Sequence, residues 1–505
     1  MPPFHEQRPS SGQCTRTNTA NRRTTPELVE TRYLALYCLS SKNPMGVVPI
    51  LARAVGRPSA IGFFMPLKPL TPPPSPPQWR KPPEPAQAPA PVPVRWQLQR
   101  LLDAPHRLGF FSAALGLSIT ALWWLAVLAL RWSGTELAWA VAPGLAHGML
   151  LSMGFMPLFI VGFLFTAGPR WLQVPELPTR VLLPAVAAYF GALLVALGGF
   201  HVSNTVAALG LAGMVLAWGH ISWLYGRLWY SSQAEDKVHG SLILLACFSG
   251  WLGMLLACIG VWTGNDTLVR SGIQMVLWLF IGTVFASVSH RMIPFFTASA
   301  IPFLDAWRPM WLLWCMVAAL WFEGIGALAD LWIWPLPSAW RWAQVAIEGP
   351  AALLMLWLAI RWGLVQSLKI RLLAMLHGGF VWLGIALLLQ ALSHAWMALS
   401  NDQQSLGLAP LHALTMGYLG ATLFAMATRV AAGHSGRPLA ADDLAWGIYW
   451  VVQTAIVLRL VAALPFTSAT WPLLAAIVLW ALACCAWSVR YGHWFGLPRK
   501  DGRPG

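Results

Sequence analysis

Twelve apolar runs of about 20 residues dominate the sequence, and that is the length a helix needs to cross a hydrocarbon core of about 30 Å. The runs are continuous, whereas the strands of a membrane β-barrel alternate apolar and polar residues. Only 10% of the residues are charged, against about 25% in soluble proteins. We therefore predict an all-α, polytopic membrane protein in the lipid bilayer. Its spans are expected near residues 108–130, 139–167, 181–199, 205–229, 239–263, 268–290, 308–330, 340–363, 370–392, 406–431, 442–464 and 470–491.

The segments between these runs alternate in charge. Lys and Arg mark cytoplasmic segments of membrane proteins, so the basic segments predict that both termini are cytoplasmic. The same orientation accounts for the net charge of +15 without a nucleic-acid partner. One side carries most of the basic residues, namely Arg170, Arg180, Arg227, Lys237, Arg291, Arg308, Arg361, Lys369, Arg371, Arg429, Arg437, Arg490, Arg499, Lys500 and Arg503. The other side has only Arg131, Arg270 and Arg341.

Three regions differ in composition. Residues 1–95 form a basic, Pro-rich tail, in which Leu67–Val94 is expected to be an extended, disordered linker. Translation from Met45 or Met65 is the alternative explanation of this tail. Residues 96–495 form the membrane domain, and residues 496–505 a cytoplasmic tail. The cysteines inside the apolar runs have no metal-binding spacing and are expected to be free, buried thiols.

Histidines fall into two layers, one toward each side of the membrane. His147, in the outer third of the second span, and His412, near the outer end of the tenth, lie at matched depths. Two facing imidazoles are suited to the axial positions of a haem iron, while the alternative is an interhelical hydrogen bond. Gly154, seven residues after His147, is expected on the same helical face, where it would let a flat macrocycle approach.

Three further ionisable residues lie inside the predicted bilayer, where such residues are costly and usually functional. Arg459 lies at a similar depth to the two histidines and is a candidate anchor for a haem propionate, or an arginine that snorkels to the headgroups. Glu323 and Glu348 are candidates for pairing with Arg459, for carrying protons or for binding a metal. Near the other side, the segment His290–Pro302 contains two prolines and is expected to break its helix.

Three segments together resemble the NnrS family: Ala146–Leu172, His290–Ala300 and His412–Leu439. In the last of them, HALTMG is followed by TRVAAGHSGRPL. The resemblance covers roughly residues 105–495. One position departs from the family pattern, since Leu145 stands where many members have the first histidine of a His-x-His pair.

The resemblance implies a bacterial inner-membrane protein that contains haem, of b type, and copper. It also implies a role in the nitric-oxide response and in tolerance of nitrosative stress during denitrification, with nitric oxide or a related small molecule as ligand. His147, His412 and His434 match family histidines, and His434, His290 and His377 are the copper candidates. Neither catalysis nor the electron donor can be assigned.

Two broader comparisons bear on function. Twelve helices with histidines on the second and tenth resemble the large subunit of haem–copper oxidases, which is an analogy of fold only. The seventh span lacks the adjacent histidines of the oxidase copper site, which argues against a complete oxygen-reducing or nitric-oxide-reducing centre. The alternative function is a secondary transporter of a small solute, metal or haem, in which Glu323 and Glu348 would serve at a midplane site.

Overall fold

A computed structural model describes residues 95–467 and 469–502, and the predicted tail lies outside these residues apart from Arg95. The described part is all-α, with 12 helices long and apolar enough to cross a membrane, as predicted. Three spans consist of consecutive elements: α3 (Pro143–Met149), η2 (Leu150–Gly154) and α4 (Met156–Leu172); α8 (Asp266–Gln274), η3 (Met275–Gly282) and α9 (Thr283–Ala300); α14 (Ala409–His412), η4 (Ala413–Ala421) and α15 (Thr422–His434). The others are single helices: α2 (Pro105–Trp132), α5 (Thr179–Val202), α6 (Asn204–Ser231), α7 (Val238–Thr263), α10 (Met310–Trp332), α11 (Ser338–Arg361), α13 (Arg371–Leu399), α16 (Asp443–Ala463) and α17 (Trp471–Phe495). Two short helices remain, η1 (Leu98–Leu102) and α12 (Leu364–Ser367).

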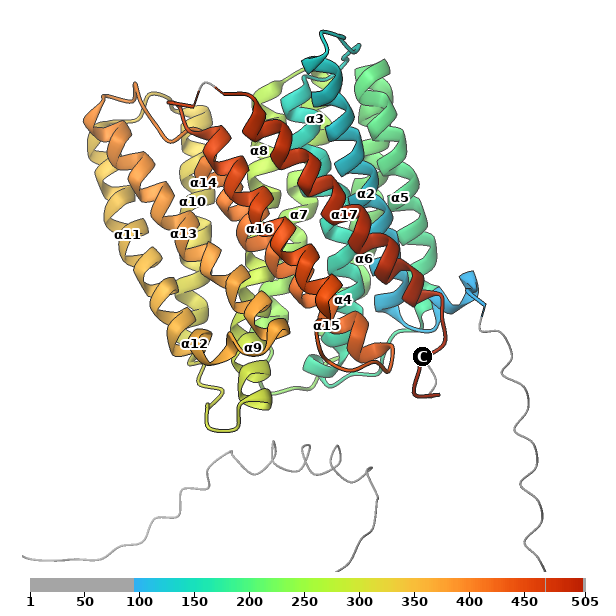
Figure 1. The fold of residues 1–505 in the computed structure, drawn as a ribbon. Coiled ribbons are helices and arrows are strands. Elements are labelled where there is room, and N and C mark those ends of the chain that lie inside the picture. The colour runs from blue at the N-terminus through green and yellow to red at the C-terminus, as the bar shows by residue number, and fades with distance from the viewer. Residues whose placement is uncertain (1–94, 468, 503–505) are drawn as a thin grey trace, which may run out of the picture. The chain divides into compact units, whose positions relative to one another are not determined.

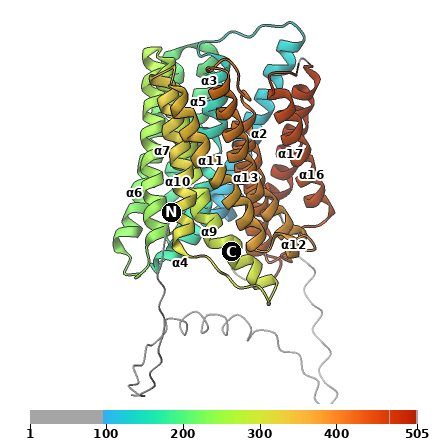
Figure 2. The ribbon, with the colours of Figure 1, turned by 90° about the vertical axis from the view of Figure 1, so that its left-hand side faces the viewer.

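Successive spans run up and down the bundle, as Figures 1 and 2 show. The first and last spans, α2 and α17, pack side by side. The Gln97 amide donates a hydrogen bond to the Gly496 carbonyl (3.0 Å), and Arg107 donates to the carbonyls of Phe495 and Leu497 (3.0 and 2.9 Å). We call this end of the bundle, where residues 95–104 and 496–502 lie, the proximal end, and the opposite end the distal end.

The bundle is apolar on its outside as well as in its interior. Leu216 and Val489 are each 75% exposed, although both lie within membrane-spanning helices, α6 and α17. Many other large apolar side chains are exposed as well. Such a surface would be unfavourable in water, whereas lipid tails are as apolar as leucine. The outer surface of the bundle is therefore suited to contact with acyl chains.

Three of the spans contain a π-helical segment: η2, η3 and η4. A π-helical turn inserts an extra residue into an α-helix, and such insertions are frequent at functional sites. The periodic apolar pattern of the sequence does not reveal these segments, because a single inserted residue leaves the run apolar.

The helix ends within His290–Pro302, as predicted, although beyond the span end expected near residue 290. Helix α9 continues through Pro294 and ends at Ala300. A proline inside a membrane helix removes only one backbone donor, and packing of neighbouring helices compensates for the loss. The chain leaves the helix at Ile301, whose backbone is extended (φ −128°, ψ 90°), because a residue before proline disfavours the helical conformation.

Candidate functional site

The distal half of the bundle encloses a cavity of about 730 Å³, lined by His147, His412 and Arg459. These are the three residues predicted to bind a cofactor, and they come from α3, α14 and α16. Cofactor sites in proteins are typically concave and largely apolar, with volumes of about 300–1,000 Å³ and a few polar groups. The cavity therefore has the size and composition of a cofactor site.

The two histidines in this cavity have nitrogens that are not used in holding the fold. His412 Nδ1 lies 2.9 Å from the Leu408 carbonyl oxygen. Since a carbonyl can only accept, Nδ1 carries the proton, and Nε2 of the neutral ring keeps its lone pair. His147 stacks on Trp124 with 4.1 Å between ring centroids, and its Nδ1 is buried without a hydrogen-bond partner among the described residues. Both imidazoles are thus oriented by the protein and remain available as ligands.

The cavity is strongly cationic. Arg131 and Arg270 line it together with Arg459, and its lining contains no Asp or Glu. Within the described residues none of these three guanidinium groups forms a salt bridge. Arg459 is partly buried, whereas Arg131 and Arg270 are exposed. Three positive charges without a carboxylate partner around one cavity favour an anionic ligand. The sequence placed Arg131 and Arg270 on the side of the membrane that has few basic residues, but it did not predict that they line the cofactor cavity.

All three π-helical segments contribute to the wall of this cavity. Leu151 comes from η2, Leu277 from η3, and Thr415 and Met416 from η4. The distortions are therefore concentrated around one site in three spans that are far apart in the sequence. Since such turns are frequent at functional sites, this concentration makes the cavity the stronger candidate site.

Gly154 does not lie in this wall, contrary to the expectation from helical spacing. A Cβ at this position would meet Leu193 (3.3 Å) and Thr120 (3.5 Å) on neighbouring helices. The extra residue in η2 changes the helical phase between His147 and Gly154, so that positions seven apart no longer share a face. Leu145, which departs from the family pattern, is buried and does line the cavity.

The copper candidates lie near the proximal end in separate contacts. His290 Nδ1 is 3.1 Å from His239 Nε2, and its Nε2 is 3.2 Å from the Pro309 carbonyl oxygen. His377 Nε2 is 3.0 Å from Thr297 Oγ1. The His434 ring lies 4.3 Å from that of His106, a partner that sequence reasoning did not identify. Among the residues that the structure describes, no three His, Cys, Asp or Glu side chains are grouped to hold a metal ion.

The two buried glutamates lie outside the cavity lining, and neither pairs with Arg459. Glu348 instead accepts a hydrogen bond from His394 Nδ1 (2.8 Å). The pairing of Glu323 or Glu348 with Arg459 is therefore not realised. The five cysteines of the described spans are free, as expected.

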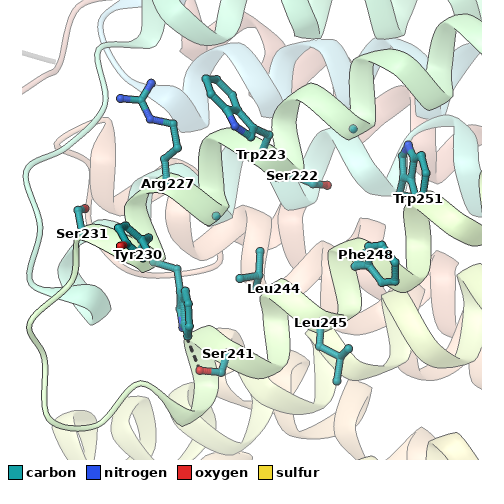
Figure 3. Close-up of a pocket in the computed structure, with 13 residues that line it drawn as sticks. Ser222, Trp223, Arg227, Tyr230, Ser231, Ser241, Leu244, Leu245, Phe248 and Trp251 are labelled. Carbon is teal, nitrogen blue, oxygen red and sulfur yellow. Dashed lines mark hydrogen bonds between the residues drawn. The ribbon is translucent and has the colours of Figure 1, made fainter.

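A larger recess of about 1030 Å³ lies between α6 and α7 (Figure 3). Trp223, Phe248 and Trp251 line it, and Arg227 stands at one end. None of the predicted site residues contributes to this recess. Its largely apolar wall is suited to acyl chains, so the recess does not compete with the distal cavity as a candidate site.

Comparison with known proteins identifies the family. A search of curated proteins gives no match to the chain. The family described as NnrS protein matches residues 100–499. This match includes all twelve spans and every residue that lines the distal cavity. The chain therefore belongs to the NnrS family.

Proposed function

We propose that this membrane protein of the nitric-oxide response holds a b-type haem in the distal cavity, with His147 and His412 as axial ligands. The observation that carries the proposal is the pairing of two available imidazoles with uncompensated arginines in one cavity. Imidazole nitrogens are common axial ligands of haem iron. The haem propionates would supply the negative charge that Arg459, Arg131 and Arg270 lack.

The protein side of such a site is defined by hydrogen bonds and packing. The Leu408 carbonyl fixes the tautomer of His412, and the stacked Trp124 ring fixes the plane of His147. Leu277, Ile281 and the other apolar side chains of the wall exclude bulk water. A haem held there would supply an iron centre for electron transfer or for binding nitric oxide, which is small and uncharged and reaches the cavity through the bilayer.

Copper is the second cofactor in this proposal, and we place it at His434. His290 is hydrogen bonded to His239 (3.1 Å) and to the Pro309 carbonyl (3.2 Å), and the ring of His377 is bonded to Thr297 (3.0 Å). The His434 ring lies 4.3 Å from that of His106, whose Nδ1 is buried without a partner among the described residues, and two adjacent imidazoles are suited to copper. The copper content of purified protein should fall in His434→Asn and stay unchanged in His377→Asn. Copper retained in His434→Asn would refute this assignment.

We further propose that the protein resides in the bacterial inner membrane and supports tolerance of nitrosative stress during denitrification, as its family suggests. Transport of an anionic solute is the alternative, because the cationic cavity would attract one. A stoichiometric bound haem favours the first function, and solute-dependent uptake into vesicles without haem favours the second.

A reduced-minus-oxidised optical spectrum of the purified protein tests the haem assignment. The wild type should show the bands of a low-spin haem, and His147→Ala and His412→Ala should each abolish them. His220→Ala, at an exposed position on α6, is the matched control and should leave the bands unchanged. A colourless wild type after haem-replete expression would refute the proposal.

A further inference from the structure

Glu323, Glu348 and His394 form a buried cluster where α10, α11 and α13 meet. Their exposed fractions are 2%, 1% and 3%. His394 Nδ1 lies 2.8 and 2.9 Å from the two carboxylate oxygens of Glu348, and Glu323 on α10 is close enough to Glu348 for two negative charges to repel each other. Three ionisable groups at membrane depth are costly to bury, which makes the cluster a candidate for function.

Hydrogen-bond geometry shows where protons already lie in this cluster. Gln390 Nε2 is 3.3 Å from His394 Nε2, and an amide nitrogen can only donate. His394 Nε2 is thus the acceptor, so Nδ1 carries the proton that is donated to Glu348. No donor among the described residues reaches Glu323 Oε1. A buried carboxyl group without a donor is held in its neutral form, because burial and a neighbouring carboxylate both disfavour a second negative charge, so Glu323 carries a proton.

In this state the cluster carries one negative charge that nearby groups do not compensate. Arg341, a buried cation on the same helix as Glu348, donates instead to Asp330 (2.6 Å) and Asp402 (3.0 Å). One positive guanidinium group thus pairs with two negative carboxylates, so it does not also neutralise Glu348. Gln344, which accepts from Arg341 at 3.0 Å, separates this ion-pair network from the cluster.

We propose that Glu323, Glu348 and His394 form a proton-binding site that exchanges one proton with the distal surface. The incoming proton, from water, binds His394 Nε2 while the Nδ1 proton moves to Glu348, and Gln390 turns its amide oxygen toward the new N–H. The cluster then holds both carboxyl groups protonated beside a neutral imidazole. Release reverses these bond changes. The polar network above the cluster opens to water through Asp330, whose side chain is 27% exposed.

Infrared difference spectroscopy of the protein in lipid nanodiscs tests this proposal without any bound cofactor. At neutral pH we expect one protonated-carboxyl band, which Glu323→Gln removes. Acidification should add a second band together with uptake of about one proton per chain. Glu348→Gln should lose both the second band and the uptake. Glu136→Gln, at an exposed position in the distal loop, is the matched control and should keep both signals.

Several results would overturn the proposal. A carboxyl band that never changes with pH would make the Glu323 proton a permanent part of the fold. Equal proton uptake in wild type and Glu348→Gln would place the titrating group elsewhere. A response to sodium at fixed pH would make the ligand a metal cation. Glu323→Gln should fold, since a neutral amide replaces a neutral acid of almost the same size. If Glu348→Gln does not fold, the pH response of the wild type and of Glu323→Gln still decides the question.

Discussion

Arg341 is a fully buried, charged residue whose side chain links three segments of the distal end. Its guanidinium donates to Asp330, Asp402 and Gln344, and its exposed fraction is 0%. Breaking a buried ion pair by removing one partner typically costs about 3–5 kcal/mol, because the other charge stays buried. Arg341→Met should therefore lower the thermal denaturation temperature of the purified protein markedly. Arg180→Met, at an exposed position, should leave it unchanged, and equal melting of the two variants would contradict this account.

At the residue scale, depth in the membrane could be predicted but lateral neighbours could not. The positions of His147, His412 and Arg459 along their helices placed them at one level, and the structure brings all three to one cavity. Their additional neighbour Arg270 is remote in sequence from each of them. Its position depends on which helices pack together, and an apolar pattern that is similar on every span carries little of that information.

At the scale of elements, the close crossing of α7 and α8 positions one wall of the distal cavity. A Cβ at Gly272 would lie 2.4 Å from the Gly253 carbonyl oxygen and 2.7 Å from the Ala257 nitrogen. Both contacts are with backbone atoms, which cannot rotate away. Small residues at such crossings let membrane helices approach closely.

Gly272→Ala should therefore push α8 away from α7 and displace Arg270 and Gln274, which line the cavity. Overpacking of this kind typically costs about 1–3 kcal/mol, so the variant should denature at lower temperature and bind less haem than wild type. Gly191→Ala is the matched control, because a Cβ there meets nothing within 4 Å. Wild-type stability in Gly272→Ala would show that the two helices can move apart freely.

The π-helical segments explain why helix-face arguments failed within correctly predicted spans. The span predicted near residues 139–167 is present as Pro143–Leu172, yet Gly154 faces away from the cavity and Met156 lines it. A phase shift within a helix leaves its length and hydropathy unchanged. Existence and order of the spans were therefore predictable from sequence, whereas the residues facing the site beyond η2 were not.

At the scale of the whole molecule, charge distribution predicts how the bundle sits in the membrane. Residues 95–104 and 496–502 meet at the proximal end, and the predicted basic segments, such as those with Arg227, Arg361 and Lys369, also lie at this end. Lys and Arg mark the cytoplasmic side. A fluorescent protein fused after Gly505 should therefore fluoresce in the cytoplasm, and alkaline phosphatase inserted in the distal loop at Gly134 should be active. Phosphatase activity at the C-terminus instead would reverse the orientation.

The proton-binding cluster and the distal cavity share a helix contact that can couple them. Gly324, next to Glu323, lies against Trp278 of η3, where a Cβ would be 2.8 Å from Trp278 Cβ. Trp278 Nε1 donates to Gln274 Oε1 at 2.9 Å, and Gln274 lines the cavity. We therefore expect a change of charge at the cluster to act on a helix that forms part of the proposed haem site. Such coupling is reciprocal between two ligands, here the proton and the electron.

This coupling predicts a pH-dependent reduction potential for the proposed haem. Reduction adds a negative charge, which favours proton binding at the cluster, so the potential should fall as pH rises. Full coupling of one proton to one electron corresponds to about 59 mV for each tenfold change in proton concentration, and a site coupled only through α10 and η3 should show a fraction of that slope.

Optical redox titrations over a series of pH values measure this slope of the reduction potential. The slope should flatten in Glu348→Gln and persist in Glu136→Gln. Because Glu348 lies outside the cavity lining, equal slopes in wild type and Glu348→Gln would mean that the two sites work independently, even if each one exists.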